Sequence, residues 1–189
     1  MKGNNVLILL MFFFIWSCAS INYKEMAVED PTKLIAIRDS LDNNLSPSIV
    51  EALVIAYNNI GISALKLNNY EASINSFSKS QELLNTDKVS NYYLLMVRAH
   101  QKYNTGKKEY LWEAIQNYYK ASEIYPLKGE PFYYIGKSYL KIGDKDFDLI
   151  LESYDKALSL EVESDVKNLI REDRIEVLRR KELLKNFWK

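Results

Sequence analysis

Few side chains in this sequence belong to the types that catalyse reactions or bind metal ions. His100 is the only histidine and Cys18 the only cysteine among 189 residues. A single histidine excludes a metal site built from several histidines, and we find no basis for a histidine-paired nucleophile. The sequence also contains no phosphate-binding glycine loop, no HExxH motif and no GxSxG motif. It therefore predicts a protein that is not an enzyme and that holds no cofactor.

Three aspartates at alternate positions imitate the start of a calcium-binding loop. Asp144, Asp146 and Asp148 have the required spacing, but such a loop also needs a glycine and a glutamate further on. Leu149 and Asp155 stand at those two places. The aspartates are better explained by the start of a helix, where the helix dipole favours negative charge. The sequence predicts no metal site.

The N-terminus has the pattern of a segment that targets the chain for export. Lys2 precedes an apolar run over residues 6–16, which is shorter than the ~20 residues that a membrane-spanning helix needs. Cys18 follows this run, so the segment resembles a bacterial lipoprotein signal peptide, although Trp16 stands where a small residue is usual. The resemblance implies a signal peptide over residues 1–17, lipid on Cys18 and a tether over residues 18–29. An uncleaved N-terminal anchor and ordinary secretion with a spare thiol are the alternatives.

The charge balance and the scarcity of helix breakers restrict the class of protein. The chain has 25 basic and 25 acidic side chains, which argues against a nucleic-acid partner attracted by bulk charge. It has only 6 glycines and 4 prolines, and no stretch alternates apolar and polar residues as a strand would. These features predict an all-α protein.

Apolar residues recur at steps of three and four along the chain after residue 30. Asp30-Pro31 and Ser46-Pro47 each place a capping side chain before a proline, as at the first turn of a helix. The pattern predicts an N-terminal helix within residues 30–45 and a long C-terminal helix within residues 163–189. Between them it predicts paired helices over residues 47–67, 70–84, 89–103, 109–125, 131–142 and 147–160.

The paired helices carry a repeated arrangement of small and aromatic residues. The second helices contain Ser73, Phe77 and Ser80, then Ala114, Tyr118 and Ala121, then Ile150, Tyr154 and Ala157. The first helices contain Tyr57, Ile60, Gly61 and Ala64, then Tyr93, Met96, Val97 and His100, then Phe132, Ile135, Gly136 and Tyr139. This pattern resembles the tetratricopeptide repeat (TPR) family. The resemblance implies a TPR-like α-solenoid of antiparallel hairpins, with three repeats over residues 46–162 and a capping helix over residues 163–189. It also implies that His100 packs between helices.

In TPR arrays the first helix of each hairpin lines the concave face, so the resemblance implies a groove for a partner. The groove would be lined by Asn58, Asn59, Ile62, Lys66, Leu94, Leu95, Arg98, Gln101, Lys102, Tyr133, Tyr134, Lys137 and Lys141. Five of these residues are cationic and none is acidic. Because the chain as a whole is neutral, this predicts a groove that attracts acidic groups. Solvated lysines without a binding role are the alternative.

Two functions fit these expectations. In the first, a scaffold anchored by lipid to a bacterial membrane docks an extended or helical segment of another envelope protein, as in outer-membrane or pilus assembly. The anchor would place it on the periplasmic face of the outer membrane or on the cell surface. In the second, an accessory protein of an envelope transport system holds a small molecule or a lipid. A deep apolar pocket between Leu94, Leu95 and Tyr133 would favour the second function.

Overall fold

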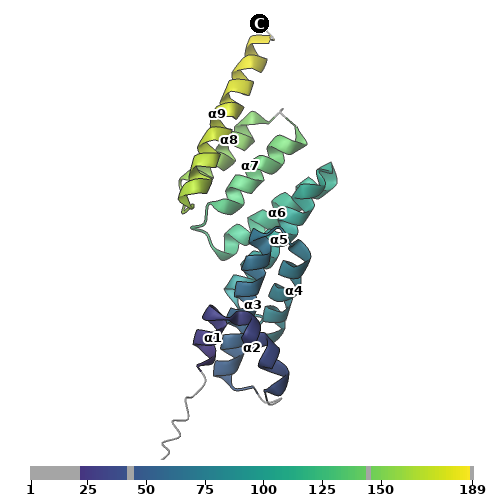
Figure 1. The fold of residues 1–189 in the computed structure, drawn as a ribbon. Coiled ribbons are helices and arrows are strands. Elements are labelled where there is room, and N and C mark those ends of the chain that lie inside the picture. Colours follow the sequence, from purple (N-terminus) through teal and green to yellow (C-terminus); the bar gives the residue numbers. More distant parts are fainter. Residues whose placement is uncertain (1–21, 42–44, 144–145, 188–189) are drawn as a thin grey trace, which may run out of the picture.

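The structure is a computed structural model that describes residues 22–41, 45–143 and 146–187. These residues form nine α-helices and a short 3₁₀ helix, with no strand among them. Consecutive helices pack side by side along an elongated array, with the first and last helices at opposite ends (Figure 1). The prediction of an all-α helical-repeat solenoid is therefore confirmed. The expected signal peptide and Cys18 lie outside the described residues.

Three helical hairpins form the body of the array, and shorter or single helices cover its two ends. The elements are α1 (Tyr23–Glu29), α2 (Pro31–Ile37), the 3₁₀ helix η1 (Arg38–Ser40), α3 (Pro47–Lys66), α4 (Tyr70–Leu83), α5 (Lys88–Thr105), α6 (Lys108–Ile124), α7 (Glu130–Ile142), α8 (Phe147–Leu158) and α9 (Ser164–Phe187). Helices α3 and α4, α5 and α6, and α7 and α8 make the hairpins, and α9 packs on α8.

Several helices begin where the sequence supplies a capping side chain. The Ser46 hydroxyl accepts a hydrogen bond from the backbone N–H of Ile49, and the Asp30 carboxylate accepts one from Lys33. In both helices proline occupies the first turn, where it loses no helical hydrogen bond. Gly106 ends α5 with φ of 69°, a left-handed conformation that glycine adopts without strain. These local signals fix the helix boundaries that the sequence predicted.

The segment expected to be a tether contains a packed helix. Helix α1 lies against α3, and its Ala27 is completely buried in a cluster with Leu34 and Leu53. The Asn59 side chain on α3 donates a hydrogen bond of 3.0 Å to the carbonyl oxygen of Ala27. Burial of the apolar face of α1 stabilises this arrangement, so the expectation of a tether over residues 18–29 is corrected from Tyr23 onward.

Close crossings within the first and third hairpins depend on glycine. A Cβ atom on Gly61 would lie 2.7 Å from the ring of Phe77, and one on Gly136 would lie 2.5 Å from the ring of Tyr154. Both aromatic rings are fully buried. The two hairpins therefore pack as the repeated small and aromatic residues predict, with an aromatic side chain of the second helix against glycine of the first.

Polar contacts fasten α9 to the third hairpin. Arg174 forms a two-pronged ion pair with Asp155 of α8, with donor–acceptor distances of 2.6 and 3.2 Å. The Tyr133 hydroxyl on α7 donates a 2.9 Å hydrogen bond to Asp173. Ile170 and Val177 are buried below these contacts, and the last turns of α9 extend beyond α8 (Figure 1). Helix α9 thus covers the end of the array as a cap.

Helix α3 is the one helix in the described part of the chain with the length and apolar composition of a membrane span. It packs between α1 and α2 on one side and α4 and α5 on the other. Apolar residues of α3 pack against these neighbouring helices, and Ala52, Leu53 and Ala56 are completely buried.

Candidate functional site

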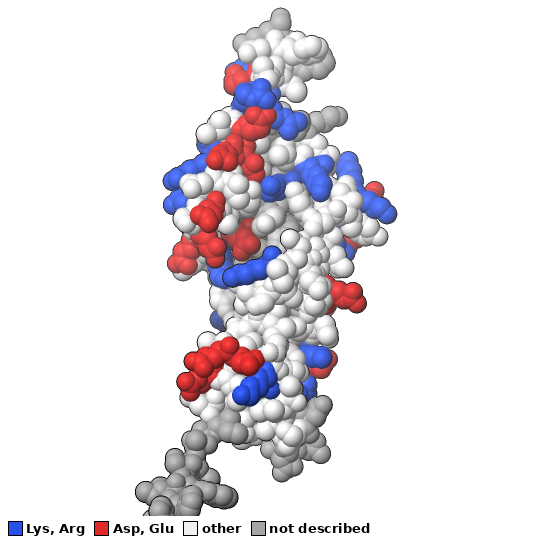
Figure 2. All heavy atoms as spheres, in the orientation of Figure 1, with Lys and Arg blue, Asp and Glu red and all other residues white. Residues whose placement is uncertain are grey.

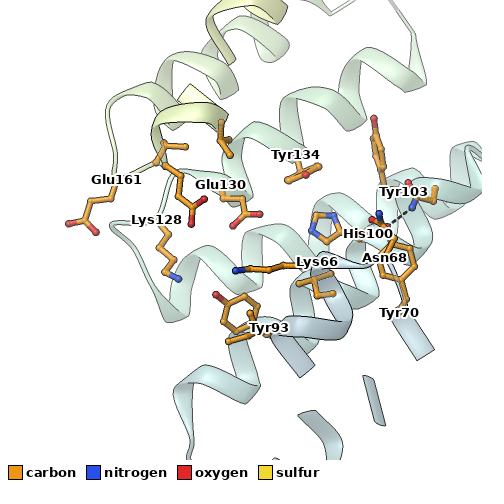
Figure 3. A pocket seen from close by; sticks show the side chains of 16 residues that line it. Lys66, Asn68, Tyr70, Tyr93, His100, Tyr103, Lys128, Glu130, Tyr134 and Glu161 are labelled. Carbon is orange, nitrogen blue, oxygen red and sulfur yellow. Dashed lines mark hydrogen bonds between the residues drawn. The ribbon is translucent and has the colours of Figure 1, made fainter. Parts of the chain in front are cut away.

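A hollow of about 830 Å³ lies between the first helices of the three hairpins and the turn that leads into α9 (Figure 3). Aromatic rings line its middle, and charged side chains gather at the end nearest α9. The lining residues are Ile62, Leu65, Lys66, Asn68, Tyr70, Tyr93, His100, Tyr103, Asn104, Lys128, Glu130, Tyr134, Glu161, Val162, Glu163 and Val166. The hollow therefore draws on five helices and three turns that are distant in the sequence.

Two turns joined by backbone hydrogen bonds build the charged end of the hollow. The backbone N–H of Gly129 donates a 2.9 Å hydrogen bond to the carbonyl oxygen of Glu161. The backbone N–H of Glu161 donates a 2.8 Å hydrogen bond to the carbonyl oxygen of Leu127. Gly129 has no room for a side chain, because a Cβ atom there would overlap the Ala157 carbonyl oxygen. This pairing holds Lys128 and the first residue of α7, Glu130, beside the start of α9.

His100 lies where α5 packs on α6, with one edge on the hollow. Its Nδ1 shares a 2.8 Å hydrogen bond with the Tyr118 hydroxyl, and the centre of its ring is 4.4 Å from that of Tyr134. The side chain is buried, and this burial lowers the pKa of His100 to about 4. The imidazole is therefore neutral at pH 7. The expected packing of His100 between helices is confirmed.

The Lys128 ammonium lies over the faces of three tyrosine rings. Its Nζ is 4.7 Å from the ring centre of Tyr92, 5.2 Å from that of Tyr125 and 5.4 Å from that of Tyr93. The electron-rich faces of aromatic rings attract a cation at such distances. The structure thus contains a tyrosine cage that holds the chain's own cation.

Glu130 is a half-buried carboxylate beside this cage. Burial raises the pKa of Glu130; the nearby Lys128 opposes the increase, and Glu163 adds to it. Within residues 22–41, 45–143 and 146–187, no hydrogen bond or ion pair engages its carboxylate. Figure 3 shows the Glu130 carboxylate turned toward His100, with Lys66 reaching in from α3. The charged end of the hollow therefore contains an acid without a direct partner.

The residues expected to form one groove are divided between separate places. Ile62, Lys66 and Tyr134 line the hollow. Leu94, Leu95 and Arg98 line a second cavity of about 410 Å³ with residues of α4 and α6, and Gln101 lines neither cavity. This placement corrects the expectation of a single groove.

The remaining expected groove residues have partners within the fold. Asn58 donates a 2.9 Å hydrogen bond to Asp87, Asn59 binds the Ala27 carbonyl oxygen, Tyr133 and Lys137 contact Asp173, Lys102 pairs with Glu113, and Lys141 donates to the Tyr103 carbonyl oxygen. Four of the five expected cations do not reach the hollow, and Glu130, Glu161 and Glu163 do. The prediction of a groove with cations and no acids is therefore wrong for the hollow.

The expected groove residues of α5 lie apart from the hollow because the predicted repeat alignment of this helix is wrong by one residue. Tyr92, Met96 and Ala99 pack toward Tyr118 of α6, whereas Leu94 and Val97 pack toward Phe77 of α4. The aligned position is thus Tyr92, not Tyr93 as the repeat suggested. One residue rotates a helix face by about 100°. This rotation moves Arg98 away from the hollow and brings Tyr93 and His100 onto it.

Lys128 and Glu130 are the site residues that the sequence reasoning missed. Lys128 lies in the turn before the third hairpin, and Glu130 is the first residue of α7, one residue before the helix that the sequence predicted. A sequence signal that could have found them is the pair of opposite charges around a glycine, Lys128-Gly129-Glu130, in the short connection between two strongly periodic helices. No group of histidine, cysteine and acidic side chains in the described part of the chain could hold a metal ion.

Charged side chains of both signs are mixed over the face in Figure 2. No extended area of a single sign covers this face, in agreement with a formal net charge of zero. Recognition in the hollow therefore depends on individual charges and not on a broad charged surface. No known protein family matches the sequence, and no curated protein matches it.

Proposed function

We propose that this protein is a TPR-type scaffold, anchored by lipid at Cys18 in the bacterial cell envelope, that binds a segment of another envelope protein in the hollow. The observation that carries this proposal is the hollow itself, which extends across all three hairpins. Its tyrosines offer large contact surfaces that lose little side-chain entropy on binding. The segment would be extended or helical, and outer-membrane or pilus assembly is the kind of process that such a scaffold serves.

Two charged residues of the hollow lack the ion pairs that several charged residues elsewhere in the array form. Lys102, Arg174 and Lys181 each form an ion pair with a carboxylate on a neighbouring helix. Within the described ranges, Lys66 and Glu130 have no such ion pair although both line the hollow. Charged groups without a partner in the fold are available for a ligand, and this supports binding at the hollow.

The structure does not favour a small-molecule or lipid carrier. Such a function would be supported by an apolar pocket formed jointly by Leu94, Leu95 and Tyr133. Instead Leu94 and Leu95 line the second cavity, and Tyr133 is buried with its hydroxyl on Asp173 of α9. A protein segment fits the long, mixed hollow better than a compact apolar ligand does.

Photocrosslinking in intact cells tests the partner proposal. A benzophenone amino acid at Lys66, which points into the hollow, should crosslink a discrete envelope protein that mass spectrometry identifies (Figure 3). The matched control is the same amino acid at Lys120, an exposed lysine of α6 that lines neither cavity. The proposal predicts at least a tenfold stronger product from position 66. Equal products from both positions, or none from position 66, would contradict it.

Metabolic labelling tests the proposed anchor. An alkyne analogue of palmitate should label the wild-type chain, and Cys18→Ser should abolish the label because the chain has no second cysteine. Ser17→Ala keeps the thiol and should keep the label. Click detection on a gel measures the incorporation. A wild-type chain without label would exclude lipid attachment at Cys18. It would not bear on partner binding in the hollow.

A further inference from the structure

The charged end of the hollow combines an acid that lacks a direct partner with the exposed faces of aromatic rings. We propose that it binds a basic side chain, arginine or lysine, of the partner segment, with the cation at Glu130 and the aliphatic stem along Tyr93 and Tyr134. This inference rests on the proposed function, because it names the chemistry of the segment that the hollow binds. It reverses the sign of the partner charge that the sequence predicted.

The first argument is that the Glu130 carboxylate, half-buried and without a direct partner, lowers the stability of the folded chain. A carboxylate that is removed from water without a compensating partner destabilises the folded chain. Lys128 lies near enough to influence its charge but forms no ion pair with it, because its ammonium is held over the three tyrosine rings. A cation supplied from outside would complete the environment of Glu130.

The second argument is that the adjoining cage already holds a cation. Three ring faces surround the Lys128 ammonium, and one of them, Tyr93, also lines the hollow. Tyr134 lies on the other side, with Glu130 near enough to contribute to the raised pKa of its hydroxyl. Ring faces and carboxylates both favour cations, and the three glutamates of the lining outnumber its two lysines.

The third argument excludes an acidic group as the occupant of this corner. Glu163 is close enough to Glu130 to add to the rise in the pKa of the Glu130 carboxyl that its burial causes. An acidic side chain would bring a third negative charge to the same place. Lys66 and Lys128, the two lysines of the lining, would have to overcome the repulsion from three negative charges.

The apolar part of the lining indicates a peptide and not a free polyamine. Ile62, Leu65, Val162 and Val166 lie around the same hollow as Glu130. An aliphatic or aromatic side chain next to the basic residue would bury apolar area against them. A polyamine carries no such group, so it would use only the charged corner.

Selection from a random peptide library tests the inference with the full chain in detergent. Phage that display random 12-residue peptides are selected on the wild-type chain, and enriched peptides are synthesised for titration. We expect arginine and lysine to be enriched several-fold beside apolar residues, and Glu130→Gln to weaken these peptides at least tenfold. Glu152→Gln, which removes an exposed carboxylate that lines neither cavity, should change the affinity less than twofold.

The outcomes separate this inference from the proposed function. Enrichment of acidic residues, or peptides that bind Glu130→Gln as tightly as wild type, would overturn the inference while peptide binding remained. Recovery of no peptide would overturn both. Spermidine binding as tightly as the peptides would show that the corner recognises any amine, which would also overturn the inference. Glu130→Gln should fold at least as stably as wild type because it removes a half-buried carboxylate that has no direct partner. Thermal unfolding therefore shows whether a loss of binding is caused by unfolding.

Discussion

Lowering the pH from 7 to 4 should reduce the free energy of unfolding by about 3 kcal/mol through His100 alone. The pKa of the folded imidazole is about 4, and that of the unfolded chain is close to the ordinary 6.5. The unfolded state therefore binds the proton more tightly, so this contribution is complete above pH 6.5. It is lost progressively as the pH falls from 6.5 toward 4. Urea unfolding followed by circular dichroism at pH 7, 5.5 and 4.5 measures the change.

The substitution His100→Gln separates this effect from those of other groups. Because the chain has one histidine, the variant should lose the part of the pH dependence between 6.5 and 4 that His100 causes. Glu130 acts in the opposite direction: its raised pKa means that protonation in this range favours the folded state. The comparison of wild type with His100→Gln cancels the contribution of Glu130. Identical pH profiles for the two chains would show that His100 is not buried in neutral form.

The helices were predictable because local patterns determine them. Residues 131–142 were expected to be helical, and α7 spans Glu130–Ile142. Glycine and aromatic positions in the first and third repeats also predicted the contacts that Gly61 and Gly136 make. These signals lie within a single hairpin, where sequence spacing converts directly into distance.

The candidate site was less predictable because it depends on how α5 is rotated. Tyr92 and Tyr93 are adjacent aromatic residues, and either could occupy the expected position, so the repeat pattern could not decide between them. In the structure the ring of Tyr92 packs on Tyr125 of the same hairpin, and Tyr93 stacks on Phe77 of the previous one. Such a choice is made by contacts between hairpins, which spacing within one hairpin does not record.

The partners of the expected groove cations were also invisible in the sequence. Lys137 meets Asp173, which lies on a different helix and 36 residues further along the chain. Lys141 reaches the backbone of Tyr103 in another hairpin. A count of lysines along the first helices therefore overestimated the free positive charge. The fold gives those lysines partners within the array, and it gathers three glutamates at the hollow from the start of α7 and the turn before α9.

Gly136→Val should lower the free energy of unfolding by about 3 kcal/mol, because the crossing of α7 and α8 has no space for a side chain. Its Cβ would lie 2.5 Å from the ring of Tyr154 and 3.2 Å from the Cβ of Ser153. Tyr154 is completely buried against α7 and α9, so its ring cannot move aside without opening the packing of the cap. Urea unfolding at pH 7 measures the loss.

Two further variants show whether steric overlap causes the loss from Gly136→Val. Ser63→Val places the same branched side chain at an exposed position of α3, and it should change stability by less than about 1 kcal/mol. In a Tyr154→Leu background the ring is absent, so Gly136→Val should cost markedly less than it does in wild type. Equal costs in the two backgrounds would mean that the ring does not limit the crossing. A reduced cost would show that the Tyr154 ring, which packs against both α7 and α9, limits how closely the third hairpin can be filled.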